Sequence, residues 1–206
     1  YPSDSDSKYG IFVKGITESL IKKGVEVRFL CVIKGRDHNN FSKMLKYLKL
    51  YFCTVYNLLF KKTDAVYFHY PLHFAPLLYV LSFFMIKPSI LNFHGTDLRD
   101  NNSGILGFFE KLMNRPVRFA RLIIVPSGHL QQKVCEKFGI KEESVFVSPS
   151  GGVDFTLFKM TDDNPAFTRE YVGGFVSRIS ELKGWNVYLD AISILKKKGV
   201  ITTQKF

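Results

Sequence analysis

The sequence predicts an α/β fold built on a parallel sheet. Short apolar runs, each with the length and composition of a buried strand, occur at Ala65–His69, Ile90–Phe93, Leu122–Val125 and Val145–Val147. The segments between these runs are long enough for helices of about ten or more residues. Strands that alternate with such helices form βαβ units, and their crossover connections make neighbouring strands parallel.

The first 33 residues predict a helix followed by a strand. After a polar start, Phe12, Val13, Ile16 and Leu20 recur at helical spacing, and Gly24 follows two lysines. Cations in the last turn and a glycine beyond it are typical of a helix end. Alternating apolar residues in Val25–Ile33 then predict a strand. We expect the chain to begin after the first strand of its sheet.

The segment Phe41–Lys62 predicts a long helix. One face carries an apolar stripe of the kind that packs on a core, made of Phe41, Leu45, Leu48, Phe52, Val55 and Leu59. Apolar and basic residues also lie off this stripe, namely Leu50, Leu58 and Phe60 among Lys43, Lys46 and Lys61. This outer surface has two interpretations: contact with an anionic membrane, or a solvated basic face with some additional apolar packing.

The remaining elements complete one domain and begin another. Pro71–Lys87 is apolar but shorter than the ~20 residues of a membrane span, which favours a buried helix. Further helices are predicted at Ile105–Phe119 and from the N-cap Ser127 to Phe138. After a polar linker, residues 169–206 hold one βα unit, too short for a core of its own. The predicted domains are therefore 1–160 and 161–206.

Composition excludes several classes of protein. Hydrophobic residues make up 46% of the 206 residues, and the net charge of +11 favours anionic partners. The three cysteines are scattered, and the first residues do not resemble a signal peptide, so we expect a reducing, cytoplasmic location. No GxGxxG turn, nucleic-acid module or metal-binding spacing occurs in the sequence.

Polar residues that follow the predicted strands are the candidate site. His94, Gly95, Thr96 and Asp97 come directly after Ile90–Phe93, and ligands of open α/β sheets bind at the carboxyl ends of strands. Gly95 lets the backbone approach a ligand closely, while His94 and Asp97 are titratable. The plainer interpretation is a polar loop that caps a helix. His69 and His73, near another strand end, are assigned a structural or acceptor-side role.

Five motifs in this order resemble the retaining GT-B glycosyltransferases of glycosyltransferase family 4. They are Tyr9–Val13, His94–Asp97, Val125–Ser127, Ser148–Asp154 and Gly174–Gly184. The resemblance covers almost the full length. It implies two Rossmann-like domains, of which this chain holds the N-terminal, acceptor-side domain and the first βα unit of a truncated, nucleotide-sugar-binding domain. The family's paired glutamates have no counterpart here, so this fragment alone is expected to be inactive.

The resemblance also implies roles for individual residues. His94 would be catalytic, beside the transferred sugar, and the cations Arg178 and Lys183 would hold the diphosphate. Further donor contacts are expected at Gly10, Gly152 and Asp154, and acceptor or sugar contacts at Tyr9, Asp97 and His69. No cofactor and no metal are expected, because the nucleotide-diphosphate sugar is itself a substrate. Surface charges and a tight turn are the plainer interpretations of the donor residues.

The expected activity is transfer of a sugar, of hexosyltransferase type, with retention. The acceptor would be a glycan or a lipid-linked glycan in surface polysaccharide or glycolipid biosynthesis, at the inner face of the membrane. The alternative is a catalytically incomplete transferase domain that acts as a binding or membrane-docking module.

Overall fold

The computed structural model describes residues 1–4, 6–7, 9–35, 39–84, 87–98, 104–149, 174–177, 179 and 181–200. The chain divides into two compact units, Tyr1–Gly152 and Val153–Phe206. Each unit is described by itself below.

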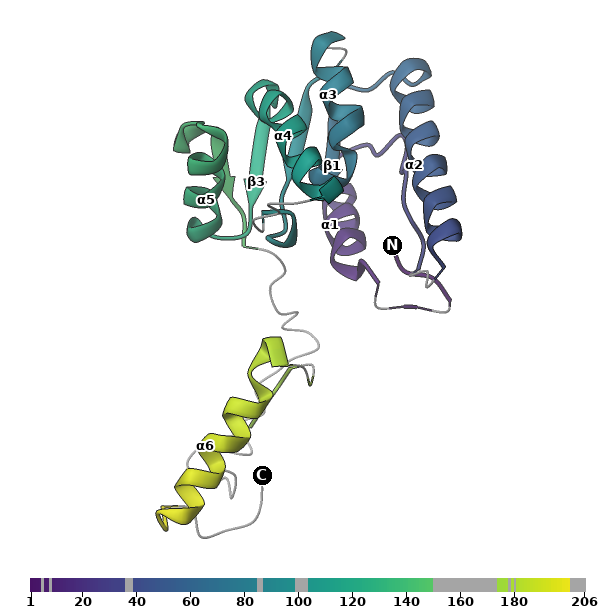
Figure 1. Cartoon of the computed structure of the whole chain (residues 1–206). Coiled ribbons are helices and arrows are strands. Elements are labelled where there is room, and N and C mark those ends of the chain that lie inside the picture. Colours follow the sequence, from purple (N-terminus) through teal and green to yellow (C-terminus); the bar gives the residue numbers. More distant parts are fainter. Residues whose placement is uncertain are drawn as a thin grey trace. The chain divides into compact units, whose positions relative to one another are not determined.

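The first unit is built on a four-stranded parallel sheet. Its strands are β1 (Val66–His69), β2 (Ser89–Asn92), β3 (Leu122–Val125) and β4 (Val145–Val147), in the spatial order β1-β2-β3-β4. Neighbouring strands pair in parallel, with Val66 opposite Ser89, Ile90 opposite Leu122 and Ile123 opposite Val145. Helices flank the sheet (Figure 1). The predicted α/β, Rossmann-like fold is therefore confirmed.

In the described part of the first unit, two α-helices precede β1 and three connect successive strands. In the first unit they are α1 (Ile11–Lys22), α2 (Asn40–Phe60), α3 (Ala75–Phe84), α4 (Gly104–Phe119) and α5 (Gly128–Phe138), with 3-10 turns η1 (Pro71–Phe74), η2 (Thr96–Leu98) and η3 (Glu142–Ser144). The second unit contains η5 (Glu181–Lys183) and α6 (Trp185–Lys197). Ser127 caps α5 as predicted, because its hydroxyl accepts the Leu130 N–H at 3.3 Å. In the part of the chain described, no helix is both long and apolar enough to cross a membrane.

The core of the first unit lies between the middle of the sheet and helices α3, α4 and α5. It includes the fully buried side chains Leu91, Phe93, Ile123 and Val125 from the β2 and β3 region, and Met113, Val117, Val134 and Phe138 from α4 and α5. The buried strand residues lie on one face of the sheet, because Phe68, Leu91, Ile123 and Val145 are opposite one another in register. This core holds the strand ends in fixed positions relative to one another.

The predicted strand Val25–Ile33 is not a strand in the structure. The segment is irregular, and Val25, Val27 and Leu30 are exposed. A strand requires a hydrogen-bonded neighbour, and the described chain offers this segment none. Its alternating side chains are therefore compatible with a strand but do not produce one. The backbone bonds near its end join Tyr1 to Ile33 and Gly35.

The apolar stripe predicted along α2 faces outward instead of toward the core. The buried residues of α2 are Leu50, Thr54 and Leu58, which form a narrower stripe at i, i+4 and i+8. Thr54 is buried without cost because its hydroxyl donates to the Leu50 carbonyl at 2.8 Å. A disulfide between Cys31 and Cys53 further holds this side of α2 against the preceding segment. The scattered cysteine spacing gave no reason to expect this pair.

Candidate active site

Two histidines meet at the carboxyl edge of the sheet. His69 is the last residue of β1 and pairs with Asn92 of β2, and the chain then passes through Phe93 to His94. Parallel strands end at the same edge, so the two rings lie together: Nδ1 of His69 is 3.1 Å from Nε2 of His94. The rings are stacked, with 19° between their planes. One nitrogen must donate and the other accept, which couples the tautomers of the two rings.

Asp97 fixes the loop that carries His94. Its Oδ1 accepts the backbone N–H of His94 at 2.9 Å, across a turn in which Gly95 has a φ of +88°. The side chain is only 5% exposed. Burial raises its pKa to about 6, although N–H groups of the backbone, at His94, Asp97 and Gly95, act to lower it. Among described atoms its Oδ2 has no hydrogen-bond partner, which leaves one buried acceptor oxygen at the site.

Two aromatic side chains enclose His94. The ring of Tyr70 lies 4.5 Å from the ring of His94, and that of Phe12, from the first turn of α1, lies 4.9 Å away. Tyr70 has a φ of +54°, and no other described non-glycine residue has a positive φ. Such a backbone costs of order 1 kcal/mol, so the surrounding contacts must hold it. Its N–H donates to the Asn92 carbonyl at 3.1 Å.

Both histidines of this cluster are neutral at pH 7. Burial lowers the pKa of His94 to about 4. Burial, and then the neighbouring His94, lowers the pKa of His69 to about 4 as well. Neutral imidazoles can each donate one hydrogen bond and accept another. The cluster can therefore bind and orient hydroxyl groups without carrying a positive charge.

The N-terminus of α1 lies beside the cluster, as the contacts of Phe12 require. Gly10, with a φ of +64°, precedes the helix, and no side chain caps it. Amide groups in an uncapped first turn point outward and attract anions. Tyr9 is also close: the pKa of Tyr70 is raised by burial, then by Asp97 and by Tyr9. The structure thus brings together Tyr9, Gly10, His69, His94 and Asp97 from three separate predicted elements.

The structure does not test the other predicted donor residues. Lys183 lies in η5 of the second unit. Arg178, Gly152 and Asp154 fall outside the described residues. Their roles stay predictions.

Sequence reasoning did not identify several residues of the cluster. Phe12 was named only within the Tyr9–Val13 motif and Tyr70 in no motif, and neither was expected beside His94. The proline after Tyr70 favours an extended backbone, so it gave no signal of the positive φ. Asn92 interrupts an otherwise apolar strand, and its amide donates to the Tyr67 hydroxyl at 2.6 Å. The Tyr67 ring in turn lies 4.5 Å from that of His69. A buried polar residue within a predicted strand was therefore an available clue.

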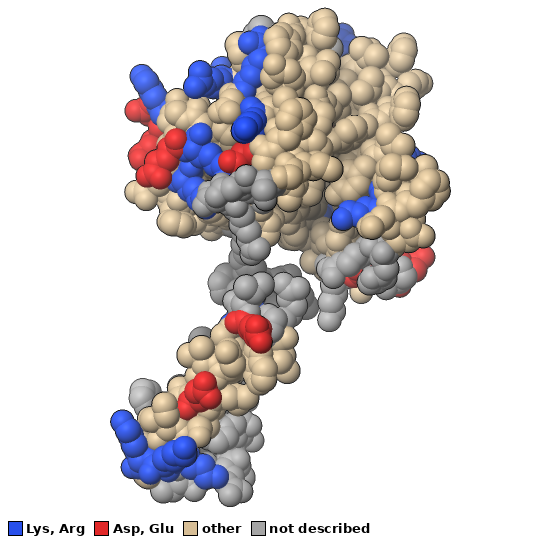
Figure 2. All heavy atoms as spheres, viewed as in Figure 1, with Lys and Arg blue, Asp and Glu red and all other residues tan. Residues whose placement is uncertain are grey.

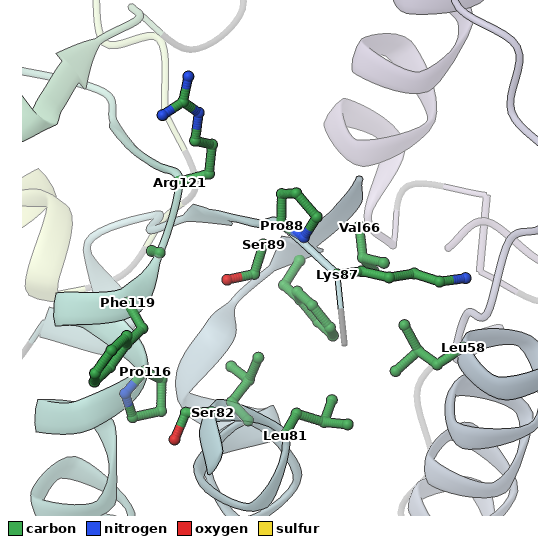
Figure 3. A pocket seen from close by; sticks show the side chains of 13 residues that line it. Leu58, Val66, Leu81, Ser82, Lys87, Pro88, Ser89, Pro116, Phe119 and Arg121 are labelled. Carbon is green, nitrogen blue, oxygen red and sulfur yellow. The ribbon is translucent and has the colours of Figure 1, made fainter. Parts of the chain in front are cut away.

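A separate cavity lies at the opposite, amino edge of the sheet. It has a volume of about 390 Å³ and is bordered by Val66 and Ser89, which begin β1 and β2. In Figure 3, Leu58, Leu81, Pro116 and Phe119 surround the space, whereas Arg121 extends away from it. None of the clustered residues at the carboxyl edge lines this cavity. Its lining is mainly apolar, so the carboxyl edge and not this cavity is the candidate site.

The described residues around the cluster form no candidate metal centre. Within the described ranges, no three histidine, cysteine, aspartate or glutamate side chains converge in a way that could hold a metal ion. The arrangement at the carboxyl edge is instead a set of neutral rings, one buried carboxyl group and a helix N-terminus.

Comparison with known families identifies the first unit. The profile of Glycosyltransferase Family 4 matches residues 10–155, a range that includes α1, the four-stranded sheet and the His69–His94 pair. No curated protein matches the chain. The matched range covers well over half of the 206 residues. The chain therefore belongs to glycosyltransferase family 4.

Proposed function

We propose that this chain is the acceptor-side part of a retaining GT-B glycosyltransferase. It would transfer a hexose from a nucleotide-diphosphate sugar to a glycan or a lipid-linked glycan, in surface polysaccharide or glycolipid biosynthesis. One observation carries the proposal: the neutral His69–His94 pair stands beside an uncapped helix N-terminus at the carboxyl edge of the sheet. Family membership supports transferase chemistry at the coarse level.

His94 would act on the transferred sugar. Its ring would hydrogen-bond a sugar hydroxyl and face the positive charge that develops at the anomeric carbon, which a neutral imidazole tolerates better than a cation would. His69 would select the tautomer of His94 through the 3.1 Å contact. Asp97 would hold the loop through the His94 N–H. Such positioned hydrogen bonds strengthen as charge develops in the transition state.

The diphosphate would be neutralised by groups that surround it. The open amides at the start of α1, beside Gly10, are suited to one phosphate. The cations Arg178 and Lys183 would grip the diphosphate from the second unit, with Gly152 and Asp154 nearby. Tyr9 would contact the acceptor or the sugar. Because nucleotide and sugar are both substrates, this scheme uses no cofactor and no metal.

A cytoplasmic location at the inner membrane face fits this scheme, since nucleotide sugars and lipid-linked acceptors would meet there. In a reducing compartment glutathione and thioredoxin systems would reduce the Cys31–Cys53 disulfide, and it would then no longer hold α2 against the preceding segment.

Transfer assays on a version that contains a complete donor-side domain test the proposal. We expect one member of a panel of uridine, guanosine, adenosine and thymidine diphosphate sugars to be consumed, with the anomeric configuration retained by NMR. His94→Ala should lower kcat/KM at least about 100-fold while the variant keeps the wild-type circular dichroism, with some loss of thermal stability because the ring packs on Tyr70 and Phe12. His129→Ala, an exposed histidine on α5, is the matched control and should remain active.

Two results would contradict the proposal. Wild-type turnover by His94→Ala would remove His94 from the site. Absence of both transfer and nucleoside diphosphate binding would favour the alternative, a catalytically incomplete binding module.

A further inference from the structure

Helix α2 presents an apolar face to solvent along its whole length. We call this the outer face of α2; its exposed side chains are Phe41, Met44, Leu45, Leu48, Phe52, Tyr56, Leu59 and Phe60. These positions recur at i, i+3, i+4, i+7, i+11, i+15, i+18 and i+19, so they share one side of the helix. Phe52 is 75% exposed and Phe60 is 70% exposed. Exposed aromatic and aliphatic side chains in such a continuous row indicate a binding surface.

The core of the unit does not need the outer face. Leu50, Thr54 and Leu58 already pack inward from the opposite side of α2, and Leu58 belongs to the main core cluster. The helix also cannot serve as a membrane span, because no described helix satisfies the requirements for one. The inner face of α2 therefore packs on the protein, whereas the outer face is exposed.

The charges along α2 point to an anionic partner. Its 21 residues include Lys43, Lys46 and Lys49 but no aspartate or glutamate, and Lys61 and Lys62 follow directly. Lys49 lies at the border of the outer face, since it follows Leu45 by four residues and precedes Phe52 by three. In Figure 2 the upper right part of the first unit, where Figure 1 draws the end of α2, is mostly uncharged surface with separate lysines and arginines.

We propose that the outer face of α2 docks on an anionic lipid bilayer. Phenylalanine and leucine on one side, lysine beside them and no acidic residue are the features of helices that lie in the membrane interface. The helix would lie flat, roughly 30 Å long, with its apolar side chains about 5–10 Å into the boundary between headgroups and acyl chains. Lys49, at the border of the outer face, would be attracted to the negative surface potential of the leaflet. Lys43 instead acts on His73, and Lys46 donates to the Lys34 carbonyl.

The inner side of α2 connects this surface to the candidate active site. The Tyr51 hydroxyl donates to the carbonyl of His73, and the Tyr47 ring lies 5.9 Å from the His73 ring. His73 belongs to η1, which directly follows Tyr70, the neighbour of His94. Docking of α2 would therefore hold the His69–His94 pair near the lipid surface. The inference does not depend on the proposed transfer, since docking and turnover are measured separately.

Vesicle flotation with the full chain tests the inference. We expect the chain to float with vesicles of 30 mol% phosphatidylglycerol in phosphatidylcholine, to stay in solution with pure phosphatidylcholine, and to bind more weakly as salt rises. Phe52→Glu should weaken binding at least about tenfold. Lys49→Glu should weaken it about fivefold for each unit of charge lost.

Two variants on α4 serve as matched controls. Phe108→Glu changes a phenylalanine that is 59% exposed, and Lys111→Glu changes an exposed lysine. Both should bind vesicles like the wild type, and all four variants should keep the wild-type circular dichroism. Equal binding to both kinds of vesicle, or binding that the controls reduce as much as Phe52→Glu does, overturns the proposal. So does a dimer that Phe52→Glu dissociates while anionic vesicles recruit nothing.

Discussion

The two oxygens of the Asp97 carboxyl group have different surroundings. Oδ1 accepts the His94 N–H, whereas Oδ2 has no partner among the described atoms. An unpartnered buried oxygen is costly when it carries charge, which explains why burial raises the pKa of Asp97 to about 6. The carboxyl group therefore stabilises the fold fully below its unfolded pKa, and this contribution is lost as pH rises through 6.

The variant Asp97→Asn tests whether the raised pKa of the Asp97 carboxyl group makes the stability depend on pH. The amide oxygen can still accept the His94 N–H, but the side chain can no longer ionise. As pH rises from 4 to 7, the free energy of unfolding of the variant should increase relative to that of the wild type. The increase should be up to about 3 kcal/mol for a pKa raised from 3.8 to about 6. Urea unfolding at both pH values measures the difference. A stability difference independent of pH would show that Asp97 ionises normally.

Individual site residues could be predicted from the sequence, but their contacts could not. His94 and Asp97 stood out because polar residues follow an apolar strand. The contact between His69 and His94 depends on the register that places His69 opposite Asn92, and register between strands 23 residues apart in sequence leaves no local signal. The contacts of Phe12 and Tyr70 with His94 also join residues that are far apart in the sequence, and no local pattern indicates them.

At the scale of elements, strands were predictable where a neighbour was available. All four apolar runs with a paired neighbour became strands of the sheet. Val25–Ile33 was predicted as a strand from alternating apolar residues but has no paired neighbour in the described chain, so this pattern alone was insufficient. For α2, the prediction of the buried face was wrong. The broader apolar stripe suggested the core side, but the buried residues are the narrow stripe of Leu50, Thr54 and Leu58.

Neighbouring leucines of α2 provide a direct check of its orientation. Leu58 is 3% exposed and Leu59 is 60% exposed. Leu58→Ala should lower the free energy of unfolding by about 2–5 kcal/mol, because it leaves a cavity in the core. Leu59→Ala should change it by less than about 0.5 kcal/mol. Urea denaturation measures the free energy of unfolding of the two variants. A larger loss for Leu59→Ala than for Leu58→Ala would support the orientation that the sequence pattern suggested.

At the scale of the whole molecule, the site makes the fold sensitive to acid. The pKa values of His69 and His94 are lowered to about 4 by burial, and burial and then Lys43 lower that of His73. The unfolded chain binds protons at these histidines near pH 6.5, before the folded chain does. Their contribution to stability is present above pH 6.5 and is lost as pH falls toward 4. The raised pKa of Asp97 makes the folded chain more stable as pH falls. The destabilising effect of the three histidines in acid is larger than this effect of one carboxyl group.

Thermal unfolding of the first unit should therefore occur at a lower temperature at pH 5 than at pH 7. In His69→Gln/His94→Gln this decrease should be clearly smaller, because two of the three responsible groups no longer titrate and glutamine preserves hydrogen-bonding capacity. His129→Gln, exposed on α5, should behave like wild type. If the double variant lost as much stability in acid as the wild type, the two rings could not be the buried, neutral pair on which the proposed function rests. In the folded chain the rings gain their positive charge only near pH 4, so the proposed transfer should decline at lower pH than the pH at which stability begins to fall.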